Sequence, residues 1–317
     1  MLRARPANQY GGKMAHQIEA LNAQFALPEQ LWFQTGENGL PKVQIDNKLA
    51  SAEIYLQGGH ITAFQPRGNK PVLWMSPLAQ FQRNKAIRGG VPIIWPWFGP
   101  HAIDKHKPQH GFARTTEWQV NATKALPDSS TQLQLQMQDT PATQALWPHA
   151  FELNLSITVG TELKIELTSR NTGEQTITIG GALHSYFAVG DIGQIHIDGL
   201  LGHNYIDQLD SNRIKRQHEA IHIRQEVDRI YFDTEDTCTE GICAIFDAKL
   251  LRQIYIKRTG SRSTVIWNPW EKKAKAMADF PDNGYRQMVC IETANAVDDV
   301  RHLAPGETHT LSQIIGL

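Results

Sequence analysis

The stretch FELNLSITVGTELKIELTSRNTG (residues 151–173) alternates apolar and polar residues on both sides of Gly160. The apolar positions are Phe151, Leu153, Leu155 and Ile157 before the glycine, and Leu163, Ile165 and Leu167 after it. A period of two is typical of a β-strand with one buried and one exposed face. The stretch therefore predicts a β-hairpin.

The same period recurs along most of the chain. TQLQLQMQD (131–139) alternates leucine and methionine with glutamine, which indicates another half-buried strand. Further β-like runs are AEIYLQGGHITAFQ (52–65), QTITIGGALHSYF (175–187), QIHIDGL (194–200), EAIHIRQ (219–225), GICAIFD (241–247), QIYIKRT (253–259), STVIWN (263–268), QMVCIETA (287–294) and HTLSQIIGL (309–317). Many strands at short spacing favour one large antiparallel β-sandwich domain. A helical spacing occurs only within residues 14–26, at Met14, Ile18, Leu21 and Phe25.

Bulk composition excludes several classes of protein. The chain of 317 residues has 31 Lys plus Arg and 32 Asp plus Glu, so no net field favours nucleic acid or an anionic membrane. No apolar run approaches the length of a membrane span, and the N-terminus lacks the apolar segment of a secretory signal peptide. Three cysteines do not form a disulfide framework, and the spacing of Cys238 and Cys243 is a poor zinc signature. We expect a cytoplasmic protein.

Two ionisable residues interrupt runs that otherwise read as buried strand. His184 lies in GGALHSYFAV (180–189), on the same strand face as Ala182 and Tyr186 and opposite Leu183. Glu292 lies in MVCIETAN (288–295). A buried histidine and glutamate can converge as a general acid and base. Each also has a structural interpretation, with His184 bonded to a backbone carbonyl and Glu292 paired with a lysine.

Polar residues in two glycine-containing segments suggest an anion site. In IRGGVPIIWPWFGP (87–100), Arg88 precedes two glycines and an aromatic segment that contains Trp95. In HKPQHGFAR (106–114), Gln109, His110 and Arg114 surround another glycine. Two guanidinium groups would form a clamp for a phosphate, and aromatic faces suit a sugar. Alternatively, the first segment is a packing loop with its aromatic residues in the core.

Two further places in the sequence carry residues that could bind a metal or a sugar hydroxyl group. His106 and His110 are four residues apart, a spacing that suits a metal on a helix, but Pro108 between them opposes a helix. We therefore expect no metal site and no cofactor. Asp228 in EVDRIYF (226–232) could accept a hydrogen bond from a sugar hydroxyl, or it could be a solvated surface acid.

Six ordered motifs together resemble the glucose-6-phosphate 1-epimerases, also called hexose-6-phosphate mutarotases. The motifs are RGGVPIIWPWFG (88–99), PQHGFAR (108–114), ALHSYF (182–187), EVDRIY (226–231), VIWNPW (265–270) and CIETAN (290–295). The resemblance runs from about residue 30 to the C-terminus. It implies an all-β, galactose mutarotase-like β-supersandwich over residues 30–317. Residues 1–29 would be an N-terminal extension, partly helical.

The resemblance also implies roles for individual residues. His184 and Glu292 look like the catalytic pair, and Arg88, Gln109, Arg114 and Asp228 fall on substrate-binding positions. His110 and Trp95 are further candidates for the site. The implied reaction interconverts the α and β anomers of glucose 6-phosphate, or of other hexose 6-phosphates, by ring opening and reclosure.

Three other functions stay open at this point. An aldose 1-epimerase for unphosphorylated sugars would use the same pair but would not need the arginines. A sugar-phosphate-binding protein would need no acid and base pair. A glycosidase would need a second well-placed acid beside Glu292, which the sequence does not suggest. We expect a hexose 6-phosphate as the partner molecule, no nucleic acid or membrane partner, and a monomer or weak oligomer.

Overall fold

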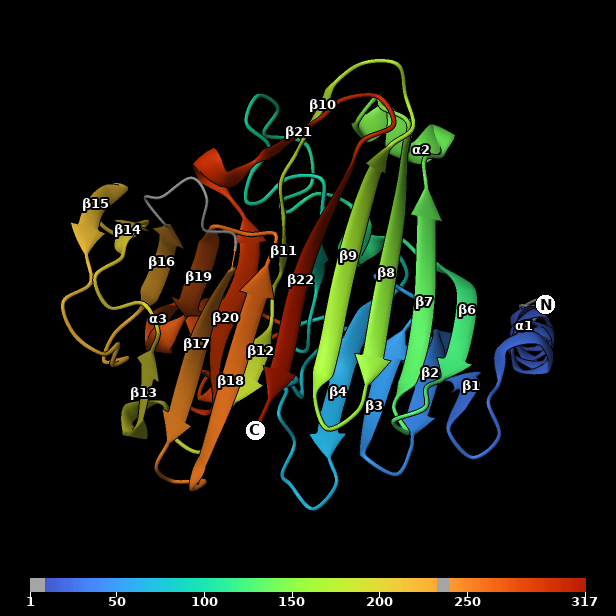
Figure 1. Cartoon of the computed structure of the whole chain (residues 1–317), viewed down its shortest axis with the longest axis horizontal. Helices are drawn as coiled ribbons and strands as arrows, with labels where there is room; N and C mark the ends of the chain where they lie inside the picture. Colours follow the sequence, from blue (N-terminus) through green and yellow to red (C-terminus); the bar gives the residue numbers. More distant parts are fainter. Residues whose placement is uncertain (1–8, 233–239) are drawn as a thin grey trace, which may run out of the picture.

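The computed structural model describes residues 9–232 and 240–317, and these fold mainly into antiparallel sheets (Figure 1). One sheet, here called the core sheet, has eight strands. Their order is β13 (Ile195–Asp198), β17 (Glu240–Asp247), β18 (Arg252–Thr259), β22 (Thr308–Gly316), β9 (Leu163–Asn171), β8 (Phe151–Val159), β7 (Thr131–Gln138) and β6 (Gln119–Ala125). Every neighbouring pair is antiparallel.

A second sheet of eight strands, here called the site sheet, carries Asp228 and Glu292, and His184 lies between two of its strands. Its order is β15 (Arg213–Arg216), β14 (Asn204–Asp207), β16 (Val227–Phe232), β19 (Ser263–Asn268), β20 (Met288–Asn295), β11 (Gly181–Leu183) and β5 (Ile93–Ile94), with β12 (Tyr186–Ala188) also paired to β20. A four-stranded sheet follows the chain order β1 (Leu31–Thr35), β2 (Pro41–Asp46), β3 (Ala50–Tyr55) and β4 (His60–Pro66), and β10 (Ile177–Ile179) pairs with β21 (Arg301–Leu303).

Helices are few and short in the described part of the chain. The α-helices are α1 (Gln9–Phe25), α2 (Pro141–Leu146) and α3 (Trp270–Ala276). The 3₁₀ helices are η1 (Glu37–Gly39), η2 (Ala113–Thr115), η3 (Ile192–Gln194), η4 (Gly284–Gln287) and η5 (Val297–Asp299). None of the described helices is long and apolar enough to cross a membrane.

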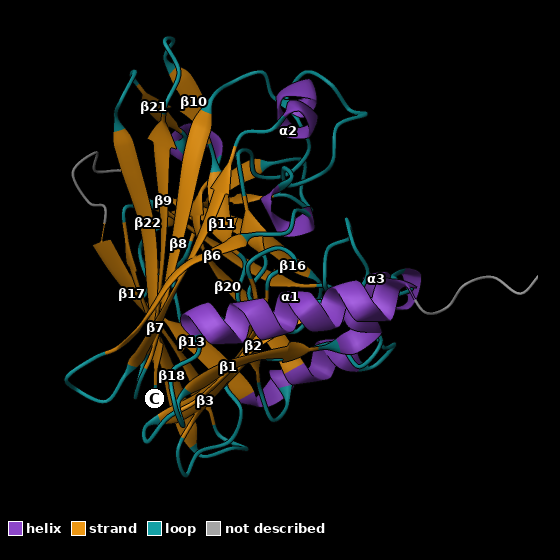
Figure 2. Ribbon diagram, turned by 90° about the vertical axis from the view of Figure 1, so that its right-hand side faces the viewer, coloured by secondary structure: helices purple, strands orange, loops and turns teal. Residues whose placement is uncertain are grey.

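One hydrophobic core joins the three larger sheets. The inward residues of β8 and β9 are fully buried and belong to the same cluster as residues of β1–β4 and of the site sheet, such as Leu183 and Phe187. Burying each such side chain contributes roughly 1.5–3 kcal/mol. Helix α1 lies beside β1 and β6 (Figures 1 and 2), and its residues Ile18, Leu21 and Phe25 pack against this cluster.

Most of the strand predictions are confirmed. The hairpin of residues 151–173 is β8 paired with β9, in register from Phe151 with Asn171 to Val159 with Leu163. The predicted helix exists but begins earlier, at Gln9. EAIHIRQ is not a strand, because it contributes only an isolated bridge between Ile221 and Ile197.

The run 175–187 is three short strands instead of one. Strand β10 pairs with β21, whereas β11 and β12 pair with β20. The backbone N–H of Gly180, between β10 and β11, bonds the carbonyl of Pro96 and so leaves the ladder. His184 and Ser185 form the second break, between β11 and β12. The predicted faces of Leu183 and His184 are nevertheless correct, since Leu183 lies in the main core and His184 lines a cavity on the other face.

Candidate active site

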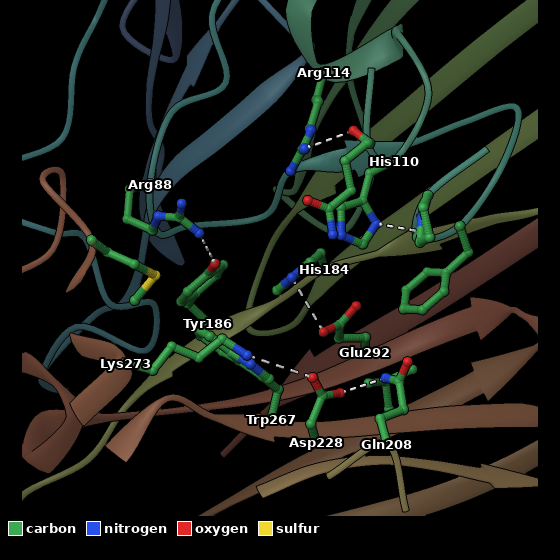
Figure 3. Close-up of a pocket in the computed structure, with 16 residues that line it drawn as sticks. Arg88, His110, Arg114, His184, Tyr186, Gln208, Asp228, Trp267, Lys273 and Glu292 are labelled. Carbon is green, nitrogen blue, oxygen red and sulfur yellow. Dashed lines mark hydrogen bonds and ion pairs between the residues drawn. The ribbon is translucent and has the colours of Figure 1, made fainter. Parts of the chain in front are cut away.

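A cavity of about 240 Å³ opens on the face of the site sheet that is turned away from the main core (Figure 3). Short strands, loops and helix α3 all contribute side chains to it. The lining residues are Arg88, Phe98, Gly99, Pro100, Gln109, His110, Arg114, His184, Tyr186, Gln208, Asp228, Val265, Trp267, Lys273, Met277 and Glu292. Seven residues predicted for the site are therefore brought together.

His184 and Glu292 meet at the break between β11 and β12. Leu183 pairs with Thr293, and Tyr186 pairs with Cys290. The residues between these two pairings, His184 and Ser185 on one side and Ile291 and Glu292 on the other, therefore lie opposite one another. The His184 Nε2 atom lies 3.3 Å from Glu292 Oε1, and both side chains are buried. The backbone N–H of His184 bonds the carbonyl of Pro92. A histidine and a carboxyl group in contact can exchange a proton and act together in acid and base catalysis.

Polar atoms of this pair are left without partners. His184 Nδ1 and Glu292 Oε2 are buried, and neither makes a hydrogen bond. An unpaired buried polar atom costs roughly 1–3 kcal/mol, so such atoms are rare unless they serve a ligand or a reaction. The imidazole is held in place by Tyr186, whose ring is stacked on it with centroids 4.9 Å apart and planes at 7°.

The surroundings of His184 and Glu292 favour the uncharged form of each side chain. Burial lowers the pKa of His184 well below its usual value, and His110, Arg114 and Arg88 lower it further. Burial raises the pKa of Glu292 well above its usual value, and Asp228 adds to the effect. Both shifts favour a neutral His184 and a protonated Glu292. Perturbed pKa values of this kind are typical of catalytic groups.

A buried glutamine of the core sheet links the segments that carry His184 and Glu292. Ser185 donates its hydroxyl hydrogen bond to Gln313 Oε1, and Gln313 Nε2 donates to Thr293 Oγ1 at 3.0 Å. Ser185 and Thr293 are the residues that follow His184 and Glu292 in the sequence. Gln313 is fully buried on β22, so the relative placement of His184 and Glu292 depends on the core sheet.

Arg88 is fixed by two partners that the sequence did not reveal. Its Nε donates to Asp279 Oδ2 at 3.2 Å, and its Nη1 donates to the Tyr186 hydroxyl at 3.1 Å. The Asp279 carboxylate balances the charge of the guanidinium, and the Tyr186 hydroxyl group helps to fix its orientation at the cavity. Gly90 allows the loop to approach β4, because a Cβ atom there would lie 2.1 Å from the Ile61 carbonyl oxygen.

Arg114 is less completely paired than Arg88. Its Nη2 donates to the Gln109 carbonyl at 2.8 Å, but its Nε is buried and has no hydrogen-bond partner. Burial lowers its pKa to about 10. Within residues 9–232 and 240–317, no carboxylate forms an ion pair with Arg114. A desolvated guanidinium with an unused N–H is suited to an anionic ligand.

His110 is held as a neutral hydrogen-bond donor. Its Nδ1 accepts the backbone N–H of Gly99 at 3.1 Å, which leaves Nε2 to carry the ring proton. Burial, followed by Arg114 and Arg88, lowers its pKa to about 3. Gly111 beside it has a φ of 68°, and a Cβ atom there would lie 1.9 Å from the Trp95 carbonyl oxygen.

Asp228 lines the cavity opposite the arginines. Its Oδ1 accepts from Gln208 Nε2 at 2.6 Å, and Lys273 Nζ lies 3.8 Å from Oδ2. Burial raises the pKa of Asp228 from its usual value. An aspartate paired with an amide forms a hydrogen-bonding edge for sugar hydroxyl groups.

Trp95 is the predicted candidate that lies away from the cavity. Its ring packs in the core against Phe112, Trp147 and Phe151, and only its backbone contacts the Gly111 segment. This position supports the alternative interpretation, in which Trp95 belongs to a packing loop.

His184, Cys290 and Glu292 form one set of donor atoms that a metal could use. Cys290 is two residues before Glu292 on β20, and one donor atom from each of His184, Cys290 and Glu292 lies within 4.8 Å of the others. Nitrogen, sulfur and carboxylate donors suit zinc. Among the described residues, neither His106 nor His110 belongs to a group of three or more such donors, and Cys238 lies outside the described residues.

Sequence reasoning missed Tyr186, Gln208, Trp267, Lys273 and Met277 as lining residues. Lys273 lies on α3, in a segment without an apolar helical period, so neither its helix nor its orientation could be predicted. Tyr186 and Trp267 were indicated only by their places in the motifs ALHSYF and VIWNPW.

Comparison with known proteins agrees with the geometry. A model of the aldose 1-epimerase family matches residues 41–316. A protein of Salmonella typhimurium with the provisional name glucose-6-phosphate 1-epimerase is 37% identical over 282 residues, which cover 87% of this chain and 92% of that protein. A crystal structure from the same organism, provisionally titled a mutarotase, has a TM-score of 0.84 and 32% identity, and covers 95% of this chain and 99% of its own.

The predicted fold class is also confirmed. The galactose 1-epimerase of Lactobacillus acidophilus has a TM-score of 0.70 at 10% identity and covers 90% of this chain and 98% of that chain. The family match spans most of the chain and includes every lining residue of the cavity. The chain therefore belongs to the aldose 1-epimerase family, and it is an enzyme that interconverts the anomers of a sugar.

Proposed function

We propose that this enzyme interconverts the α and β anomers of glucose 6-phosphate, with His184 and Glu292 as the catalytic pair. The observation that carries the choice of a phosphorylated substrate is the state of Arg114. Its buried Nε has no partner, and no carboxylate of the described chain is paired with it. A phosphate would supply the missing charge and acceptor at the same time.

Two other groups would support the same anion. Arg88 lines the cavity with its Nε and Nη1 already engaged, so its remaining N–H groups are available for a ligand. His110 presents a neutral N–H donor on the same side of the cavity. Each hydrogen bond between a charged donor and an acceptor contributes about 1.5–3 kcal/mol. An unphosphorylated sugar would leave this cationic end unused.

The opposite end of the cavity suits the sugar ring. Asp228 and Gln208 form a hydrogen-bonded edge, and we assign them to ring hydroxyl groups together with Gln109. Trp267 lines the cavity between this edge and Tyr186, and an apolar ring face can pack against it. This arrangement separates recognition of the phosphate from recognition of the hydroxyl groups.

In the proposed reaction, Glu292 takes the proton of the anomeric hydroxyl group while protonated His184 donates to the ring oxygen. The bond between C1 and the ring oxygen breaks and an aldehyde forms. Rotation about C1–C2 and reclosure with reversed proton transfers give the other anomer. An acid and a base contribute about 10²–10⁴-fold each, which is enough for a reaction that sugars already perform slowly in water.

Substitution of Arg114 tests the choice of substrate. The Arg114→Gln variant should lower kcat/KM for glucose 6-phosphate by about 10- to 100-fold, because one charged contact is worth roughly 1.5–3 kcal/mol. The same variant should not lower kcat/KM for free glucose, because free glucose has no phosphate group for Arg114 to bind. Arg67→Gln is the matched control, because Arg67 pairs with Asp46 on the surface outside this cavity.

Two results would contradict the proposal. Equal losses on glucose and glucose 6-phosphate would mean that Arg114 does not bind the phosphate. A wild-type kcat/KM that is higher for glucose than for glucose 6-phosphate would assign the enzyme to unphosphorylated sugars.

A further inference from the structure

The charges around the catalytic pair are arranged asymmetrically. In Figure 3, Arg88 and Arg114 lie on the His184 side of the pair, and Asp228 lies on the Glu292 side. The contacts agree, because Arg88 bonds the Tyr186 hydroxyl group and the Tyr186 ring is stacked on His184. Cations near the imidazole oppose its protonation, and an anion near the carboxyl group opposes its ionisation.

Several charged or titratable groups surround His184 and Glu292, and together they set the direction in which the proton of the pair moves. The groups that line the cavity with the pair are Arg88 before β5, His110 before η2, Arg114 on η2, Tyr186 on β12, Asp228 on β16 and Lys273 on α3. Cys290 adjoins the pair on β20. The charge of Asp228 is partly balanced by Lys273, and that of Arg88 by Asp279. Arg114 has no such balance among the described ion pairs.

The charges around the pair oppose the proton distribution that the proposed reaction needs. Burial and the cations lower the pKa of His184, while burial and Asp228 raise the pKa of Glu292 against a smaller lowering by Arg114. Both shifts favour the proton on Glu292, whereas the reaction needs an ionised Glu292 and a protonated His184. The two atoms that exchange it, Glu292 Oε1 and His184 Nε2, are 3.3 Å apart.

We propose that the phosphate group of the substrate takes part in the chemical step, because its charge neutralises the arginines beside His184 and drives the proton from Glu292 to His184. This proposal rests on the proposed function and assigns a second role to the phosphate site. A phosphate monoester carries about −1.5 to −2 charges at neutral pH, which offsets the unbalanced charge of Arg114 and adds negative charge beside Arg88. The phosphate is then an activator as well as a binding handle.

The proton balance of the cycle is closed. The proton moves from Glu292 Oε1 to His184 Nε2 when the oxyanion binds. His184 donates it to the ring oxygen, and Glu292 takes the anomeric hydroxyl proton. On reclosure His184 takes the proton of the attacking hydroxyl group and Glu292 donates its proton to the carbonyl oxygen, so no oxidant, reductant or further reactant is needed.

A separate oxyanion should therefore activate a sugar that has no phosphate. Saturating phosphite dianion should raise the enzyme-catalysed anomer exchange of free glucose at least tenfold, measured by saturation-transfer NMR at pH 7.5. Phosphite is itself a weak base, so the enzyme-free rate is subtracted, and potassium chloride at equal ionic strength is the salt control. Arg114→Gln should abolish the activation, whereas the surface variant Arg67→Gln should retain it.

A second measurement reads the protonation state directly. ¹⁵N NMR of His184 should show a neutral ring in the free enzyme and an imidazolium when glucitol 6-phosphate, which has no ring to open, is bound. In Arg114→Gln, bound glucitol 6-phosphate should shift the ring nitrogens less. The assignment of the signal is fixed by its loss in His184→Asn.

The outcomes separate this proposal from the proposed function. If glucose 6-phosphate is turned over but phosphite does not accelerate glucose exchange, the activating role is wrong and the substrate assignment stands. The same conclusion follows if His184 stays neutral in the glucitol 6-phosphate complex. Absence of exchange on glucose 6-phosphate would instead overturn the proposed function.

Discussion

Strands β8 and β9 bury one face and expose the other, whereas strands β19 and β20 are buried along their whole length. In the first pair the buried residues are almost all apolar, so burial and stability go together. In the second pair the face opposite the main core lines a cavity and carries Glu292, and buried polar atoms remain without partners. One region stabilises the fold, and the other gives up stability for a reactive site.

The largest expected effect concerns the stabilising region. Leu155 on β8 is fully buried in the main core, so Leu155→Ala should lower the free energy of unfolding by about 2–5 kcal/mol. Turnover of the protein that remains folded at low temperature should stay within about twofold of wild type. Chemical denaturation and kinetics at 10 °C measure the two effects. If Leu155→Ala lowered kcat strongly but changed the free energy of unfolding little, the account of β8 and β9 as a region that serves stability alone would be wrong.

The next effect concerns the link between the two sheets. Gln313→Met removes both hydrogen bonds that Gln313 makes with Ser185 and Thr293, and it should lower kcat about tenfold with little change in KM. The physical reason is a loss of alignment between His184 and Glu292. The pH profile of kcat should also shift, whereas a purely structural loss would lower the amount of folded protein and leave the profile unchanged. Gln313→Glu keeps the acceptor for Ser185 and should recover part of the activity.

A smaller effect, in this case a gain in the free energy of unfolding, is expected when Glu292 is replaced by glutamine. Because the pKa of Glu292 is raised in the folded protein, the unfolded chain releases this proton at a lower pH than the folded chain does. Stability therefore falls as pH rises from the ordinary glutamate pKa towards the raised one. Glu292→Gln removes this cost and should raise stability by about 1 kcal/mol at pH 8 and by less at pH 5. Thermal unfolding at the two pH values measures it, and a lower Tm at pH 8 would contradict the account.

No loss of activity is expected from metal removal. The catalytic scheme uses the protons of His184 and Glu292, so dialysis against EDTA should leave kcat within the error of the assay. The thiol of Cys290 near the pair makes this a necessary check. Activity that disappears on chelation and returns with zinc would show that the three donor atoms hold a working metal.

Strands β8 and β9 could be predicted from the sequence, because the alternation of apolar and polar residues is a local pattern. Residues Phe151 to Leu167 show this alternation on both sides of the turn. The site could be predicted only in part. His184 and Glu292 were recognised because they interrupt apolar runs, but more than 100 residues separate them, and no pattern shows which strands pair. Gln313 carries no sign of its role, because its partners come from the opposite sheet.

Anomer exchange measured by saturation-transfer NMR tests the central claim most directly. Wild type, His184→Asn, Glu292→Gln and the control Glu166→Gln, whose residue lies on β9 beside Lys164, would be compared on glucose 6-phosphate. We predict fast exchange for wild type and Glu166→Gln, and a loss of about 10²–10⁴-fold for each variant of the pair, with binding of glucitol 6-phosphate retained. Exchange within tenfold of wild type in both pair variants would contradict the claim that this buried pair performs the reaction.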